Sequence, residues 1–185
     1  ACWFVNMTQT NYYKNFNKLE VYSAELDNDT LIVSINSNYG LYTLGNVEDL
    51  IIGNIQFTAV SLALSNLHYK NKIVLLHSPP YASDARDGEG EGSNLFIRAI
   101  YVPVFEVCEV NFVISGDNNW YERTVPIYRG VQNNEVGITY LTSGGGGAPL
   151  HNVSNMIDDK LQDLQGNILS AVNESKYHFC VLTLN

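Results

Sequence analysis

A chain of 185 residues, 45% of them hydrophobic, is long enough to bury a core as a single domain spanning residues 1–185. Its formal net charge of −9 argues against a nucleic-acid partner and disfavours adhesion to anionic membranes. No run of about 18 apolar residues is present, so we predict no membrane span. The sequence starts at Ala1-Cys2 without an initiator Met or a signal peptide, and we expect a processed or excised segment.

The N-glycosylation sequons and the cysteines indicate in which cellular compartment the protein is expected. Some N-x-S/T sequons arise by chance in an Asn-rich chain, but four of them together with the acidic charge favour a secreted glycoprotein. The three cysteines are an odd number, and their spacing fits no zinc motif. Cys108 is expected to be a buried free thiol, and a disulfide between Cys2 and Cys180 stays open. The candidate glycosylation sites are Asn6, Asn28, Asn152 and Asn173.

Short apolar runs bounded by turn residues predict strands, and longer periodic runs predict helices. A helix is expected over residues 47–67, with Asn46 as its cap. A second, short helix is expected to begin at Pro103, because proline is tolerated in a first turn. The core-facing side of the first helix is predicted to carry Ile51, Ile55, Ala59, Leu62 and Leu67. The predicted strands lie near 30–36, 73–77, 110–115, 136–142 and 177–184.

Polar side chains follow two of these strands. His77 closes the apolar run Ile73–Leu76, and Asp117-Asn118-Asn119 follows the run Val110–Ile114 after the turn Ser115-Gly116. Ligands of open α/β sheets bind just beyond the carboxyl ends of strands. We therefore predict that His77 and Asp117 converge at the ends of neighbouring strands.

The segment G-D-N-N-W-Y-E-R, residues 116–123, resembles the last metal-binding motif of the calcineurin-like metallophosphoesterases, in the purple acid phosphatase form G-H-x-H-x-Y-E-R. Gly116, Tyr121, Glu122 and Arg123 match that motif, whereas Asp117 and Asn119 stand in the places of its two histidines. The match is long enough to indicate common descent with that family. The two positions that differ from the motif are the ones whose histidines bind metal in the family.

Two further segments carry the resemblance. H-S-P-P-Y, residues 77–81, is similar to the family's fourth motif, in which the histidine is a metal ligand. G-G-G-G-A-P-L, residues 144–150, resembles the loop after a late strand, whose glycines let the backbone pass close to the site. The likeness covers residues 30–185 and implies an α/β (α+β) fold, a mixed β-sandwich flanked by helices. The early motifs D-x-H/G and G-D-x-x-Y are missing, so the chain resembles the C-terminal half of that fold.

The resemblance leaves three functions open. The first is a secreted, catalytically inactive phosphatase-like glycoprotein with a structural or interaction role and no cofactor. The second is an active acid phosphatase with a dinuclear Fe, Zn or Mn centre, completed by a missing N-terminal half, in which His77, Asp117 and Asn119 hold metal. The third is a glycan- or ligand-binding module that uses Trp120 and Tyr121 as an aromatic platform.

Half of a sandwich leaves one sheet face and its strand edges uncovered. We therefore expect the segment to pack against another protein chain or against the rest of its own precursor, in a homo- or hetero-assembly.

Overall fold

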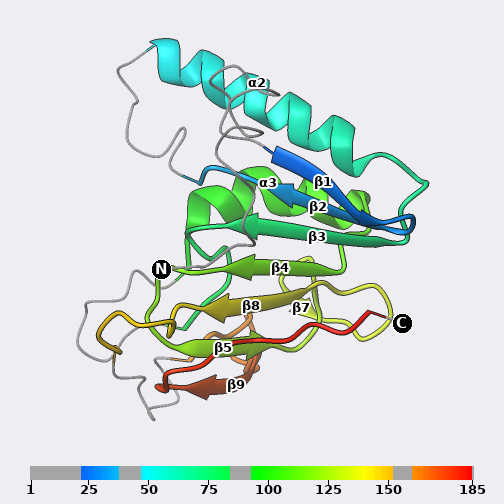
Figure 1. Cartoon of the computed structure of the whole chain (residues 1–185). Helices are drawn as coiled ribbons and strands as arrows, with labels where there is room; N and C mark the ends of the chain where they lie inside the picture. The colour runs from blue at the N-terminus through cyan, green and yellow to red at the C-terminus, as the bar shows by residue number, and fades with distance from the viewer. Residues whose placement is uncertain (1–21, 38–46, 84–92, 152–159, 185) are drawn as a thin grey trace.

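A seven-stranded mixed sheet dominates the computed structural model, which describes residues 22–37, 47–83, 93–151 and 160–184, and the side chains of its first helix from residue 53 onward (Figure 1). The strand order is β1-β2-β3-β4-β8-β5-β9, and β6 and β7 form a separate two-stranded ribbon. The strands are β1 (Tyr22–Asp27), β2 (Thr30–Ser34), β3 (Asn71–Leu76), β4 (Phe112–Ser115), β5 (Tyr121–Thr124), β6 (Ile127–Tyr128), β7 (Val131–Gln132), β8 (Thr139–Ser143) and β9 (Ser170–Glu174). The helices are α2 (Val47–Leu64) and α3 (Leu95–Val107).

The strands β2, β3, β4 and β8 run parallel in the middle of the sheet. The strand β1 is antiparallel to β2, and β5 is antiparallel to both β8 and β9. The predicted α/β class with a mixed sheet is therefore confirmed. Four of the five predicted strands are also present, as β2, β3, β4 and β8.

The core lies between one face of the sheet and the two helices. Alternate strand residues are fully buried there, as the period of two along a strand requires. From the sheet come Val33, Val74, Val113 and Tyr140, and from the helices come Val60, Leu64, Ile97, Tyr101 and Phe105. No helix in the described part of the chain has the length and apolarity to cross a bilayer.

The predicted face of α2 was wrong. Leu62 is 74% exposed, whereas Gln56 is buried and lies one turn before the core residue Val60. The amide of Gln56 donates to the carbonyl of Asn36 at 3.0 Å and to the Tyr101 hydroxyl at 2.8 Å. These bonds offset the cost of burying a polar group, and no hydrophobicity pattern registers them.

The start of α3 was also predicted wrongly. The helix begins at Leu95 because the Asn94 side chain caps it, accepting a hydrogen bond from the Ile97 amide at 2.9 Å. Pro103 therefore lies inside the helix rather than in its first turn. The buried residues Ile97, Tyr101 and Phe105 recur every four positions and hold α3 against the sheet despite the proline.

The predicted strand at 177–184 is absent, and the last strand is β9, which pairs with β5. The segment 177–184 alternates like a strand in sequence. A strand also needs a neighbour that bonds its backbone, and no strand in the described part of the chain pairs with this segment.

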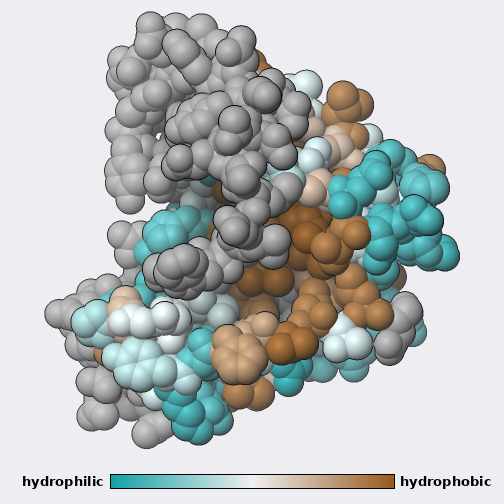
Figure 2. Space-filling model, in the orientation of Figure 1, coloured by the Kyte–Doolittle hydropathy of each residue, from teal (hydrophilic) through white to brown (hydrophobic). Residues whose placement is uncertain are grey.

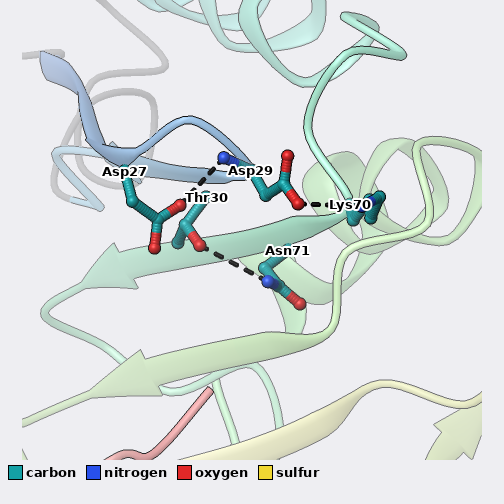
Figure 3. Close-up of polar contacts among 5 residues, drawn as sticks. All are labelled: Asp27, Asp29, Thr30, Lys70 and Asn71. Carbon is teal, nitrogen blue, oxygen red and sulfur yellow. Dashed lines mark hydrogen bonds and ion pairs between the residues drawn. The ribbon is translucent and has the colours of Figure 1, made fainter. Parts of the chain in front are cut away.

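The turn between β1 and β2 is fastened to the start of β3 (Figure 3). The Asp27 carboxylate accepts from the Asp29 amide at 2.9 Å, and this bond lowers the pKa of Asp27. Lys70 donates to Asp29 at 2.8 Å, which raises the pKa of Lys70. Both residues of this ion pair are exposed, so the bond fixes the turn's position more than it adds stability.

Candidate functional site

His77 and Asp117 meet at the carboxyl ends of β3 and β4, as predicted. The two strands are parallel neighbours, and the Gly116 amide donates to the His77 carbonyl at 3.0 Å just beyond their ends. The Nε2 atom of His77 lies 3.3 Å from Oδ1 of Asp117. The His77 side chain is 63% exposed and that of Asp117 is 22% exposed, so the pair faces solvent on the imidazole side.

A tight turn positions Asp117. Its φ of 66° lies in the left-handed region, which aspartate tolerates better than most residues. The amide of Asn118 donates across it to the Gly116 carbonyl at 2.9 Å, which closes a three-residue turn. The chain thus reverses immediately after β4 and leaves the Asp117 carboxylate beside His77.

Asn119 faces a different partner. Its Nδ2 atom lies 3.2 Å from Nε2 of His151, and the His151 amide donates to the Asn119 carbonyl at 3.3 Å. One hydrogen bond therefore joins the side-chain amide of Asn119 to the imidazole of His151. The Nδ1 atom of His151 is buried without a hydrogen-bond partner in the described part of the chain. The Asn119 side chain is thus engaged by His151, whereas His77 and Asp117 pair with each other.

Sequence reasoning missed His151. It lies 32 residues beyond Asn119, and only the insertion of β8 between β4 and β5 brings it back to this edge of the sheet. The one signal was its place directly after the glycine-rich loop that follows β8, a parallel strand ending at the same edge as β3 and β4.

Glycine at position 144 allows the two loops of the site to touch. A Cβ atom at Gly144 would lie 1.9 Å from the Asn118 carbonyl oxygen, far inside van der Waals contact. The Gly144 amide also donates to the Trp120 carbonyl at 3.1 Å. The expectation that glycines let this backbone pass close to the site is confirmed. The side chain of Asn118 beside it is buried, and neither of its polar atoms has a partner among the described residues.

Glu122 anchors the loops around the site. It is buried on β5, where Oε2 accepts from the Ser83 amide at 2.9 Å and Oε1 accepts from the Ser83 hydroxyl at 2.6 Å. The Trp120 indole also donates to Oε2 at 3.3 Å. The Ser83 hydroxyl in turn accepts from the Leu161 amide at 2.9 Å. One carboxylate thus ties the segment after β3, the segment after β4 and residue 161 together.

Trp120 cannot serve as an aromatic platform. Its side chain is fully buried, with its indole nitrogen engaged by Glu122. A glycan-stacking residue has to present its ring to solvent. The hypothesis of a binding module built on Trp120 and Tyr121 is therefore wrong in respect of Trp120.

The described residues do not assemble a metal site of the expected kind. Within 22–37, 47–83, 93–151 and 160–184, no group of three or more His, Cys, Asp or Glu side chains is close enough to hold an ion. His77 and Asp117 supply one nitrogen and one carboxylate, and the Asn119 amide is directed to His151. Such a donor set does not fit a two-metal centre, which needs a bridging carboxylate and several ligands for each ion.

Cys108 and Cys180 are free thiols in the structure. Cys108 is partly buried, and this burial raises its pKa, which lowers its reactivity. Cys180 is exposed. Cys2 lies outside the described residues, so its pairing with Cys180 stays a prediction.

No protein-family model and no curated protein sequence matches the chain. Solved structures do match its fold, and two of them are described below. Purple acid phosphatase PPD1 from yellow lupin (Lupinus luteus) seeds aligns with a TM-score of 0.66 and 18% identity over 88% of this chain. The chain has a metallophosphoesterase-like fold. GAP50, the anchor in the inner membrane complex of Plasmodium, aligns with a TM-score of 0.63 and 16% identity, also over 88% of this chain. This chain spans only 28% of the phosphatase and 46% of GAP50.

Proposed function

We propose that this chain keeps the scaffold of a purple acid phosphatase without its catalysis and serves a structural or interaction role in a secreted glycoprotein. The proposal rests on what occupies the two histidine positions of the motif and on what those residues contact. Asp117 stands where the motif has its first histidine and is paired with His77, and Asn119 stands where it has the second and is bonded to His151. The residues whose role is to anchor the loop, Glu122 above all, are retained and engaged.

The chemistry of the substitutions supports loss of the metals. Each histidine of G-H-x-H would give a neutral nitrogen to one ion. An Asp is a harder ligand with a shorter reach, and an Asn offers only a weak amide oxygen. A neighbour in fold, GAP50, is described as an anchor, so this fold also occurs in a protein described by a structural role.

The alternative is an active acid phosphatase completed by a missing N-terminal half. Two observations favour it: His77 is retained at the end of β3, and the chain spans only part of both matched structures. In that case an upstream segment would supply the bridging carboxylate and a second Asp, and His77 would be a ligand.

We expect native protein to bind no stoichiometric Fe, Zn or Mn and to hydrolyse p-nitrophenyl phosphate no faster than background. The reason is the poor donor set at His77, Asp117 and Asn119. Elemental analysis of purified material and an acid phosphatase assay check this. Close to two transition metals per chain, with hydrolysis abolished by His77→Ala and kept by His68→Ala, would establish the alternative instead. His68 is the control because it is exposed and precedes the amino end of β3, whereas His77 follows its carboxyl end.

A glycosylated protein is a separate expectation. Asn28 is exposed in the turn between β1 and β2, as a glycan acceptor has to be. Asn173 is less open, because its Oδ1 atom is buried on β9. Asn6 and Asn152 lie outside the described residues. We expect at least two of the four sites, Asn28 among them, to be modified in native material. Release of N-glycans by amidase digestion should lower the mass, and an unmodified native mass would contradict secretion through a glycosylating pathway.

A further inference from the structure

Ser143 and His178 form a hydrogen-bonded pair on the face of the sheet opposite the helices. Ser143 is the last residue of β8, and its hydroxyl oxygen lies 3.0 Å from Nε2 of His178. The Nδ1 atom of His178 lies 2.8 Å from the carbonyl oxygen of Lys176. A carbonyl oxygen only accepts, so Nδ1 carries a proton, and in a neutral imidazole Nε2 is then the acceptor for the Ser143 hydroxyl. A serine bonded to a histidine that a third group orients has the arrangement of an activated nucleophile.

Neighbouring backbone and one aromatic ring hold His178 in this orientation. The His178 amide donates to the Gly145 carbonyl at 3.2 Å, which joins the segment after β9 to the glycine-rich loop after β8. A Cβ atom at Gly145 would lie 2.5 Å from both Nδ1 of His178 and the Lys176 carbonyl oxygen, so a larger residue would displace the imidazole or its orienting group. The ring of Tyr121, which is paired with Ser143 across β5 and β8, lies nearly perpendicular to the imidazole, with the ring centroids 5.2 Å apart.

An apolar groove lies beside the pair. Its volume is about 770 Å³, which is the size of a small-molecule site, and both Ser143 and His178 line it. It runs along the second face of β4 and β8, where Phe112, Ile114 and Leu141 are half-buried. Figure 2 shows hydrophobic atoms gathered over the middle of this side of the molecule. A groove of this composition suits a ligand with an apolar portion and a polar group that faces the serine.

We infer that Ser143 and His178 are the catalytic dyad of a separate site, which hydrolyses carboxylic esters with an apolar acyl chain. The Ser143 oxygen bonds to the acyl carbon while the bond from that carbon to the alcohol oxygen breaks, and Nε2 of His178 takes the hydroxyl proton and passes it to the departing alcohol. Water then attacks the acyl-serine and gives a proton to Nε2, and Ser143 regains that proton as the acid leaves. Both steps consume only the ester and water. Gly146 also lines the groove, and its amide donates to no residue in the described part of the chain, so this N–H is available to the oxyanion that forms.

The charges around the groove select the class of ester. Among the described residues that line it, Arg123, Glu174 and Lys176 are the only Asp, Glu, Lys or Arg, and Glu174 pairs with Lys176 at 2.8 Å. A neutral ester therefore fits the groove better than an ionised one. The imidazole is oriented by a carbonyl and not by a carboxylate, so its protonated form is stabilised less than in a Ser-His-Asp triad, which favours esters with a good leaving group over amides. This inference goes beyond the proposed interaction role and does not rest on the site at His77 and Asp117.

Labelling of the full chain with an alkyl fluorophosphonate, which phosphonylates activated serines, tests the dyad directly. We expect one phosphonyl group per chain, located on Ser143 by peptide mapping. Labelling should be slower by about 100-fold or more in His178→Ala, the contribution usual for a positioned general base. His68→Ala, at an exposed histidine before β3, is the matched control and should be labelled at the rate of the parent protein. Circular dichroism establishes that both variants are folded.

Hydrolysis of p-nitrophenyl butyrate, a neutral ester with an apolar acyl chain, is the second readout. Ser143→Ala should lower the rate by about 100-fold or more, and Gly145→Ala should lower it as well, because the new Cβ displaces His178 while both catalytic side chains remain. Absence of a phosphonyl group on Ser143 in the folded parent protein, or equal labelling of the parent and His178→Ala, would overturn the inference. The bond between Ser143 and His178 would then only fasten the segment after β9 to the sheet. These readouts involve neither metal content nor p-nitrophenyl phosphate, so they are decided separately from the loss of phosphatase catalysis.

Discussion

Replacement of Glu122 by alanine is expected to lower the free energy of unfolding by about 3–5 kcal/mol, as losses of buried polar networks do. The substitution leaves three buried donors without their acceptor: the Ser83 amide, the Ser83 hydroxyl and the Trp120 indole. Each unsatisfied buried group costs about 1–3 kcal/mol, and groups in one network are not additive. The cavity left by the side chain adds to the loss.

Glu122→Gln separates hydrogen bonding from packing. The glutamine keeps the shape but offers one oxygen acceptor instead of two, so we expect a smaller loss of about 1–2 kcal/mol. Urea unfolding followed by Trp fluorescence measures both variants. Glu135→Ala, at an exposed carboxylate, is the control and should change the unfolding free energy by less than about 0.5 kcal/mol. Equal effects of Glu122→Ala and Glu135→Ala would show that the network does not hold these loops together.

The central strands of the sheet, and the candidate site at their carboxyl ends, were predictable because local sequence pattern alone decides them. The runs at β3 and β4 are continuous, β-branched and closed by turn residues, which is the pattern of central parallel strands. Because parallel neighbours end at the same edge, the meeting of His77 and Asp117 followed from the strands themselves.

Features that depend on contacts between residues far apart in the sequence were not predictable from local pattern. The burial of Gln56 rests on Asn36 and on Tyr101, which lies 45 residues away, and hydrophobic periodicity does not detect such bonds. His151 reaches Asn119 only through the strand order. The segment 177–184 has the alternation of a strand, but a strand forms only beside a neighbour, and sequence pattern does not say whether one is present.

Substitution of Gly144 by alanine is expected to destabilise the fold by about 3 kcal/mol or more, at or above the upper end of the usual cost of overpacking. The new Cβ would lie 1.9 Å from the Asn118 carbonyl oxygen and 2.7 Å from its carbon, and both are backbone atoms that no rotamer change can move aside. The loop after β8 and the loop after β4 would have to separate. The hydrogen bond from the Gly144 amide to the Trp120 carbonyl, 3.1 Å long, would then be lost.

Gly53→Ala provides the opposite case in the same chain. Gly53 lies inside α2, and a Cβ there meets no atom within 4 Å. Alanine in a helix is favoured over glycine by about 1 kcal/mol, so this variant should be more stable than the parent protein. Urea unfolding of the two variants side by side gives the contrast directly. If Gly144→Ala were tolerated as well as Gly53→Ala, the two loops would not be in contact, and the placement of Asn118 and Asn119 beside Gly144 would be wrong.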